Sequence, residues 1–229
     1  QDPIYDCGEI IGVVPIDYKV PYDVRELIAR IVDGSDFMDF KPQYGVSTLC
    51  VHTKINGFAC GIIGNNGPID PNGATKSAQF IQLCDQSDTP LIFLSNTTGF
   101  MVGKQTEQSG MIKHGSKLIQ AVSNVKVPKI TLNVGASFGA GNYAMSGKAY
   151  EPDFIFSWPN AKIGVMGGEQ AAKTMKQVMI ASAEKKGKIV DNEKLKSQLV
   201  EITEKYNSQS DAFTTSGRGL DYGLINPVD

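Results

Sequence analysis

The stretch Val134-Gly135-Ala136-Ser137-Phe138-Gly139-Ala140-Gly141-Asn142-Tyr143-Ala144-Met145 follows a short apolar run over residues 129–134. That run is rich in β-branched residues and lies between Pro128 and Gly135, so it predicts a buried strand. The small residues from Asn142 to Gly147 predict the start of a helix. Because the first N–H groups of a helix have no partner within it, a strand that passes through glycines into a helix can present these donors to a ligand oxygen. A backbone oxyanion hole is built in this way.

A second glycine-bracketed loop, Thr97-Thr98-Gly99-Phe100-Met101-Val102-Gly103, follows another apolar run at residues 90–94. Two interpretations of the pair of loops stay open. Tight packing of helices against strands also requires small residues, whereas a shared cleft would favour binding of an oxygen by backbone N–H groups. No side-chain nucleophile stands out near either loop.

Strand and helix patterns alternate along the chain and predict one α/β domain over residues 1–229. Residues 1–20 read as an irregular lead-in, and Asn56-Gly57 is a strong signal for a hairpin turn. A charged helical arm is expected over residues 184–206, with a thin apolar stripe. The remaining patterns predict strands at 47–52, 58–63, 90–94, 129–134 and 154–158, and helices at 24–32, 74–84, 108–125 and 169–179.

Composition restricts the partners. The 229 residues are 41% hydrophobic with a formal net charge of −2, so neither nucleic acid nor a membrane surface is expected to bind. The four cysteines lack a C-x-x-C pattern and predict reduced thiols. The first residues lack the pattern of a signal peptide. We therefore expect a location in the cytoplasm, or in the mitochondrial matrix if the source is eukaryotic.

Familiar catalytic motifs are missing from the sequence. His52 and His114 are not in a metal-ligand spacing, so we expect structural or surface roles for them and no metal. There is no G-x-S-x-G elbow and no phosphate-binding G-x-x-x-x-G-K-[ST] loop. Gly135, Gly139 and Gly141 are spaced G-x-x-x-G-x-G, which disfavours a dinucleotide fold.

Six motifs in order resemble the carboxyltransferase (beta) subunit of biotin-dependent acyl-CoA carboxylases, in particular the methylcrotonoyl-CoA and geranyl-CoA carboxylase branch. The motifs are Pro21-Tyr22-Asp23-Val24-Arg25-Glu26, Ile31-Val32-Asp33-Gly34-Ser35, Gly64-Asn65-Asn66-Gly67, Thr98-Gly99-Phe100-Met101-Val102-Gly103, Phe138-Gly139-Ala140-Gly141-Asn142-Tyr143 and Trp158-Pro159-Asn160-Ala161 with Met166-Gly167-Gly168-Glu169-Gln170-Ala171.

The resemblance covers only the C-terminal of that subunit's two domains, and it implies a crotonase-like (ClpP/crotonase) spiral of ββα units. In the family, the N-terminal domain of one subunit holds the acyl-CoA. The C-terminal domain of a neighbouring subunit receives carboxybiotin from a biotin carrier. The resemblance therefore implies as partners an N-terminal carboxyltransferase domain, the biotin carboxylase and carrier subunit, and further copies of the chain in a homo-oligomer.

The resemblance also assigns roles to residues. Biotin serves as the base, and the protein supplies position and two oxyanion holes. The hole for the biotin ureido oxygen corresponds to the main-chain N–H groups of Ala140 and Gly141. The residues implied to line the biotin channel are Gly99, Phe100, Met101, Val102, Phe138, Gly139, Asn142 and Tyr143. A bulky residue at Gly141 is then expected to block biotin while the fold is preserved.

Two segments depart from the family pattern. Residues 68–76 differ from the methylcrotonoyl branch, and Arg218-Gly219-Leu220-Asp221-Tyr222-Gly223 replaces a usual Arg-Leu-Trp-Asp-Asp-Gly. Methylcrotonoyl-CoA is the expected type of acyl substrate, with geranyl-CoA, propionyl-CoA and acetyl-CoA as further candidates. Two other functions stay open: a subunit of a biotin-dependent decarboxylase, and a non-catalytic domain that binds the biotin carrier or supports oligomerisation.

Overall fold

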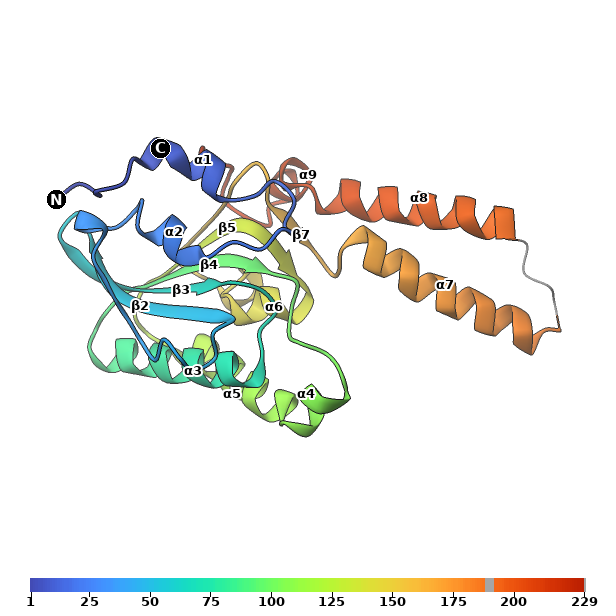
Figure 1. The fold of residues 1–229 in the computed structure, drawn as a ribbon, viewed down its shortest axis with the longest axis horizontal. Helices are drawn as coiled ribbons and strands as arrows, with labels where there is room; N and C mark the ends of the chain where they lie inside the picture. The colour runs from blue at the N-terminus through green and yellow to red at the C-terminus, as the bar shows by residue number, and fades with distance from the viewer. Residues whose placement is uncertain (188–191, 229) are drawn as a thin grey trace.

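The computed structural model describes residues 1–187 and 192–228, which fold around a seven-stranded sheet (Figure 1). The strands follow the order β1-β2-β3-β4-β5-β6, and β7 pairs with the end of β5. The first three strands are antiparallel, and the pairs from β3 to β7 are parallel. Their bounds are β1 Phe37–Asp39, β2 Thr48–Ile55, β3 Phe58–Asn65, β4 Leu91–Thr97, β5 Lys129–Phe138, β6 Phe154–Ser157 and β7 Lys162–Gly164.

Helices cover both faces of the sheet. The long helices α3 (Pro71–Gln86) and α5 (Met111–Asn124) lie on one face, and α2 (Val24–Ile28) lies on the other with the N-terminal segment (Figure 1). Each face carries its own buried apolar cluster, one around Phe80 and Phe93 and the other around Leu27 and Leu94. Because Phe93 and Leu94 point to opposite clusters, β4 is covered on both faces, as its apolar run predicted.

Helix boundaries differ from the predicted ones. Asp70 caps α3 by accepting the N–H of Gly73 at 2.8 Å, so this helix begins before residue 74. The predicted helix 108–125 is divided in two, because Gly110 adopts a left-handed conformation between α4 (Lys104–Gln108) and α5. Ile112, which the pattern placed on the apolar face, is 78% exposed.

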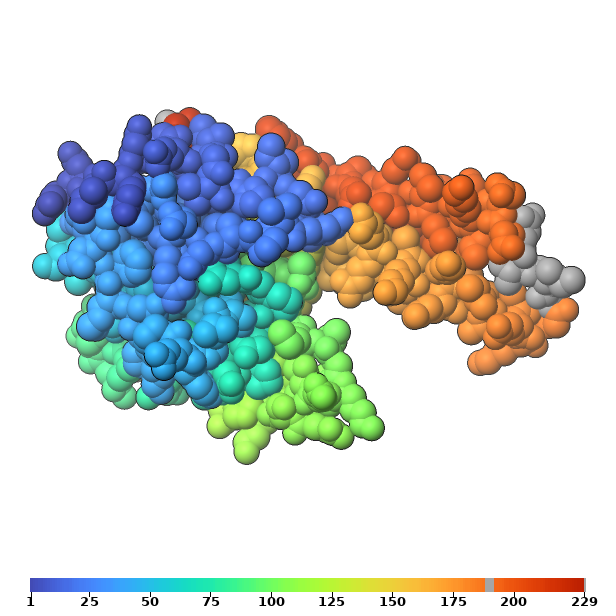
Figure 2. All heavy atoms as spheres, viewed as in Figure 1, coloured from blue at the N-terminus to red at the C-terminus, as the bar shows by residue number. Residues whose placement is uncertain are grey.

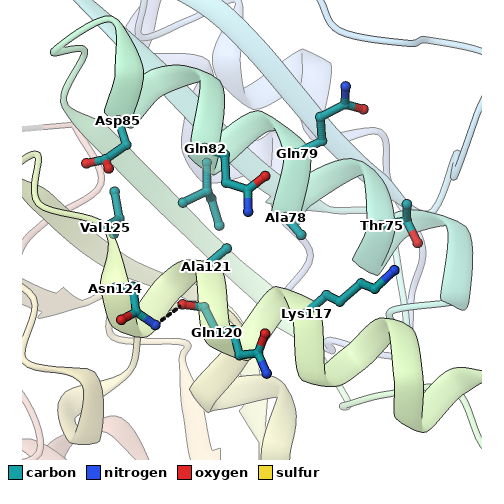
Figure 3. A pocket seen from close by; sticks show the side chains of 11 residues that line it. Thr75, Ala78, Gln79, Gln82, Asp85, Lys117, Gln120, Ala121, Asn124 and Val125 are labelled. Carbon is teal, nitrogen blue, oxygen red and sulfur yellow. Dashed lines mark hydrogen bonds between the residues drawn. The ribbon is translucent and has the colours of Figure 1, made fainter.

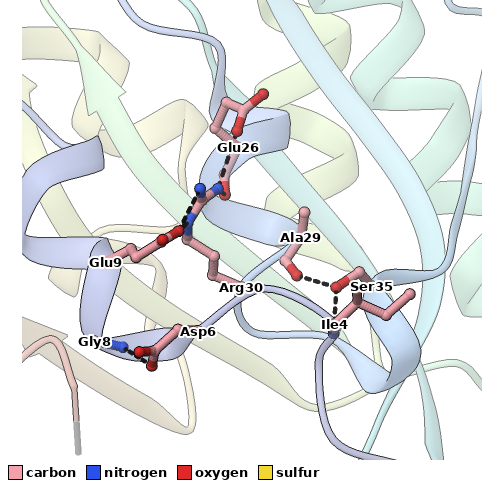
Figure 4. Close-up of polar contacts among 8 residues, drawn as sticks. All are labelled: Ile4, Asp6, Gly8, Glu9, Glu26, Ala29, Arg30 and Ser35. Atoms are coloured by element: carbon pink, nitrogen blue, oxygen red, sulfur yellow. Dashed lines mark hydrogen bonds and ion pairs between the residues drawn. The ribbon is translucent and has the colours of Figure 1, made fainter.

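Polar contacts fix the turn between β2 and β3, and other polar contacts fix the N-terminal segment. Both N–H groups of the predicted turn at Asn56-Gly57 donate to the Asp33 carboxylate at 2.7 Å, which confirms the hairpin. Residues 1–20 are not wholly irregular, because they include a 3-10 turn at Cys7–Glu9 and helix α1 at Ile10–Val13. Arg30 binds Glu9 and Glu26 and joins this segment to α2 (Figure 4).

Helices α7 (Gly168–Lys185) and α8 (Asn192–Ser210) project from the body as a hairpin (Figures 1 and 2). The predicted arm over 184–206 is thus formed by the end of α7 and most of α8, and residues 188–191 lie outside the described part of the chain. Leu195 is the buried apolar residue of α8. The short helix α9 (Ala212–Gly217) follows at the base of the arm. No helix within residues 1–187 and 192–228 is both long and apolar enough to cross a bilayer.

Candidate functional site

Strand β5 continues through the glycine stretch to Phe138, four residues beyond its predicted end, because its last residues find partners on two sides. Ser137 pairs with Thr97 of β4 and with Ile163 of β7. Helix α6 (Gly139–Ala144) begins directly afterwards, so the helix also starts earlier than the predicted Asn142. The glycine stretch is therefore strand and helix with no loop between them.

The two glycine loops meet at the C-terminal ends of β4 and β5. A Cβ atom on Gly141 would lie 2.7 Å from the Cα of Gly99 and 2.9 Å from a methyl carbon of Thr97. The loop that contains Gly99 is fixed in turn by Ile69, whose N–H donates to the Gly99 carbonyl and whose carbonyl accepts the N–H of Met101, both at 2.9 Å. The structure therefore brings both loops into one site.

Helix α6 presents its first N–H groups at this site. Phe138 is its N-cap residue, has extended backbone angles and makes no side-chain capping bond. Gly139 follows with a φ of 55°. Ala140 and Gly141 are the second and third residues of the helix, where N–H groups have no partner four residues earlier within the helix. Ala140 is exposed and Gly141 is buried against the second loop. This arrangement suits the binding of a partly negative oxygen.

Apolar side chains are carried by the second loop and by α6. Met101, Val102 and Tyr143 are exposed at the rim, while Phe100 is half-buried against Gly115 of α5. Beside them lies a hollow of about 250 Å³, lined by Phe100, Met101, Val102, Glu107, Met111, Ile112, Gly115, Ser116 and Ile119. This hollow, which begins at the loop that contacts Gly141, therefore suits a largely apolar ligand.

Two residues predicted to line the biotin channel, Phe138 and Asn142, have side chains that contact other parts of the protein. The Phe138 side chain is 2% exposed, and its ring meets that of Tyr18 edge-on with centroids 5.3 Å apart. The Phe138 side chain is therefore part of the protein interior, and its assignment to the biotin channel stays a prediction. The side-chain amide of Asn142 donates to the hydroxyl of Ser137 at 2.8 Å, so it is committed to a contact within the protein.

Asn96 organises the end of the sheet, a role that the sequence interpretation did not assign to it. The register between β4 and β5 shifts between Ser95 and Thr97, and the Asn96 side chain accepts the N–H of Ala136 at 3.0 Å. Residue 135, which faces the Asn96 side chain, has to be glycine, because a Cβ there would collide with the Asn96 side-chain oxygen. The signal available in the sequence was an asparagine within a predicted strand end, Ser95-Asn96-Thr97.

The buried phenol of Tyr22 lies beside Asn96, and burial raises the pKa of Tyr22 well above its usual 10.0. Both residues line a separate cavity of about 360 Å³ on the side of the sheet covered by residues 18–22. The hydroxyl of Tyr22 makes no hydrogen bond that satisfies ordinary geometry within residues 1–187 and 192–228. Thr98 of the second glycine loop and Ala136 of the glycine stretch also line this cavity, so it adjoins both segments.

A larger groove of about 690 Å³ runs between α3 and α5 (Figure 3). Its lining combines polar and apolar groups and includes none of the predicted site residues. The lining residues are Thr75, Ala78, Gln79, Ile81, Gln82, Asp85, Lys117, Gln120, Ala121, Asn124 and Val125. Both histidines contact α3: His114 Nδ1 forms a 2.9 Å hydrogen bond with the Thr75 hydroxyl, and the His52 ring packs on Phe80. In the described residues, no group of three or more His, Cys, Asp or Glu side chains is arranged to hold a metal ion.

Comparison with known proteins gives consistent matches. The family model "Carboxyl transferase domain" matches residues 1–229. The chain is 47% identical over 229 residues to the mitochondrial methylcrotonoyl-CoA carboxylase beta chain of Arabidopsis thaliana, covering 100% of this chain and 39% of that protein. It is also 47% identical to a probable biotin-dependent acyl-coenzyme A carboxylase beta2 subunit of Mycobacterium tuberculosis, covering 100% of this chain and 43% of that protein.

Solved structures agree. The beta subunit of Pseudomonas aeruginosa geranyl-CoA carboxylase superimposes with a TM-score of 0.93 at 54% identity, covering 100% of this chain and 43% of that one. The transcarboxylase 12S subunit, described as a hexamer assembly, gives a TM-score of 0.86 at 32% identity, with coverage of 100% and 44%. The expected crotonase-like α/β fold is thereby confirmed. The chain spans about two fifths of the length of these relatives, and it belongs to the carboxyl transferase domain family.

Proposed function

We propose that this chain is the C-terminal carboxyltransferase domain of a biotin-dependent acyl-CoA carboxylase. In that role it moves a carboxyl group from carboxybiotin to an acyl-CoA held by the N-terminal domain of a neighbouring subunit. The observation that carries the proposal is the contact between Gly141 and Gly99, which brings the second loop against the first turn of α6, where Ala140 is exposed. The names of the relatives supply the chemical class.

The N–H groups of Ala140 and Gly141 form the proposed oxyanion hole. When bound, biotin supplies the transferable carboxyl group and a ureido oxygen that gains negative charge as that group leaves. Two fixed backbone donors at the positive end of a helix stabilise such charge without reorganisation. One donor of an oxyanion hole typically contributes about 10²–10³-fold in kcat. The protein thus acts by position and electrostatics, in keeping with the lack of a side-chain nucleophile.

The rest of the biotin surface is proposed from exposure and position. Gly99 and Gly139 provide close backbone approach, while the side chains of Phe100, Met101, Val102 and Tyr143 offer apolar contact to a ring system and its chain. Because this surface carries little charge, it fits an uncharged bicyclic group better than a phosphate-bearing one. The acyl-CoA itself is assigned to the other domain, with a methylcrotonoyl-like branched acyl group favoured by the relatives named above.

The test removes one donor while the side chain stays small. Ala140→Pro deletes the N–H in the first helical turn, where proline is best tolerated, and Ala140→Ser keeps it as the matched control. Each variant is combined with the N-terminal carboxyltransferase domain and a biotinylated carrier, and acyl-CoA carboxylation is followed. We expect a 10²–10³-fold loss of kcat for Ala140→Pro and less than a threefold change for Ala140→Ser.

Full turnover by a folded Ala140→Pro protein would refute the proposed hole. Carrier binding without carboxylation, in every reconstitution including the unaltered sequence, would favour the non-catalytic binding domain instead. Carboxyl loss from the acyl-CoA in the presence of free biotin carrier, without the forward reaction, would favour a decarboxylase subunit.

A further inference from the structure

A single hydroxyl oxygen joins β4, β5 and α6 directly behind the proposed oxyanion hole. Ser137 is fully buried near the end of β5, and its oxygen accepts two hydrogen bonds. One comes from the side-chain amide of Asn142 at 2.8 Å and the other from the hydroxyl of Ser95 at 3.0 Å. We refer to these three side chains, Ser95, Ser137 and Asn142, as the Ser137 cluster.

The bond between Ser137 and Asn142 encloses the residues that carry the donors. Between them lie Phe138, Gly139, Ala140 and Gly141, and two of these four are glycines, which have the greatest backbone freedom. Helix α6 has only six residues and no side-chain cap at its N-terminus. A helix this short does not hold its own geometry in water, so its direction depends on contacts made by its side chains.

Asn142 is also fixed from the opposite side. The N–H of Gly147 donates to the Asn142 main-chain carbonyl at 2.8 Å. A Cβ at Gly147 would collide with the side-chain oxygen of Asn142, so that oxygen packs directly on the Gly147 backbone. The amide nitrogen therefore faces Ser137, and the side chain has no freedom to turn toward a ligand without breaking the bond.

We infer that Asn142 is a positioning residue for the N–H groups of Ala140 and Gly141, and does not itself contact biotin. The inference rests on the proposed function of those N–H groups. Asn142 acts through Ser137: it closes the first turn of α6 onto the end of β5 and thereby sets where the two donors point. Ser95 donates to the same oxygen, but it lies in β4, outside the enclosed turn. Its hydrogen bond therefore connects two strands of the sheet and does not restrain α6.

This difference provides a matched pair of variants. Asn142→Ala and Ser95→Ala each remove one hydrogen bond to the same oxygen, and we expect similar decreases in thermal stability. Only Asn142→Ala removes the side-chain hydrogen bond that holds α6 against the end of β5. Amide hydrogen exchange measured by NMR reports this at Met145, whose N–H donates to the Gly141 carbonyl at 3.0 Å. We expect about tenfold faster exchange at Met145 in Asn142→Ala and less than twofold in Ser95→Ala.

Activity supplies the second readout. In the reconstituted carboxylase we expect kcat to fall about 10–100-fold for Asn142→Ala with the KM for acyl-CoA unchanged, and to stay within twofold for Ser95→Ala. Ser137→Ala, which removes the shared acceptor, should reproduce Asn142→Ala and serves as a second variant should that protein be unstable.

Equal effects of Asn142→Ala and Ser95→Ala on both Met145 exchange and kcat would overturn the inference, because the cluster would then be merely structural. Faster exchange at Met145 with undiminished kcat, in an enzyme that Ala140→Pro inactivates, would overturn it as well. Activity that survives Ala140→Pro refutes the proposed hole itself, and this outcome is distinguishable because the exchange measurement does not depend on biotin.

Discussion

Replacing Lys76 by methionine is predicted to stabilise the protein. Lys76 lies in α3 with 1% of its surface exposed, and its ammonium group makes no hydrogen bond within the described part of the chain. Burial lowers the pKa of Lys76 from its usual 10.5, an effect opposed by the Cys50 thiol, Asp39 and Asp70. An incompletely paired buried charge costs several kcal/mol, of which attraction to the Asp39 and Asp70 carboxylates returns only part. Methionine fills a similar volume without charge.

We therefore expect the free energy of unfolding to rise by about 1–3 kcal/mol for Lys76→Met. Each kcal/mol corresponds to an increase of about 2–4 °C in Tm for a chain of this length. Lys129→Met is the control. Lys129 is also buried, and burial likewise lowers its pKa, but its ammonium donates to the carbonyls of Tyr150 at 3.0 Å and Val122 at 3.3 Å. Its removal leaves these acceptors without that donor and should cost about 2–3 kcal/mol.

The pH dependence gives an independent check on Lys76. With its pKa lowered in the folded state, the unfolded chain binds the proton more tightly, so unfolding free energy rises as pH increases through the folded pKa toward 10.5. Lys76→Met should reduce this rise. Urea unfolding at neutral and alkaline pH measures both effects. A loss of more than about 1 kcal/mol in Lys76→Met would show that the buried ammonium has a stabilising partner and refute the reasoning.

Three further predictions concern packing, pH and thiol reactivity. Gly141→Val should lose at least about 2 kcal/mol of stability in urea, because its Cβ would overlap Gly99; this corrects the expectation that a bulky residue preserves the fold, and a loss under about 0.5 kcal/mol would contradict it. The N–H of Gly57 is the main cause that lowers the pKa of Asp33, so this carboxylate stabilises the fold at neutral pH and the effect is lost as pH falls through the folded pKa. Asp33→Asn should therefore flatten the acid limb of the stability curve, and an unchanged limb would argue against it. Iodoacetamide with peptide mass spectrometry should modify exposed Cys7 first, since burial raises the pKa of the other thiols to about 12, 11 and 12 for Cys50, Cys60 and Cys84; early labelling of these three would contradict their burial.

Local signals in the sequence predicted the parts of the fold that local physics determines. The Asn56-Gly57 turn needs only two residues with positive φ, and both adopt it. The end of β5 depends instead on distant partners, since Ser137 pairs with Thr97 and Ile163. No pattern within residues 129–138 contains that information. For the same reason the glycine stretch was interpreted as a loop when its first half is strand.

The sequence indicated where the backbone of the candidate site lies, but it did not indicate the partners of its side chains. Both glycine loops were recognised, and the structure brings them into contact. Asn142 was assigned to the biotin channel through the family resemblance, which does not say what its side chain binds within the protein. That partner, Ser137, is only five residues away, yet the bond requires the turn at Gly139, which sequence alone leaves undetermined.

The sequence left two explanations open for the glycine loops, tight packing and ligand binding. In the structure the same contact between the loops can serve both. The 2.7 Å approach of a Cβ on Gly141 to Gly99 shows that packing alone demands glycine at residue 141. That same approach brings the loop at Gly99 against the first turn of α6, where the N–H groups of the second and third residues have no helical partner. A larger residue at 141 would push the second loop away from the first turn of α6. The close contact that the fold requires is therefore also what would give a ureido oxygen its two donors.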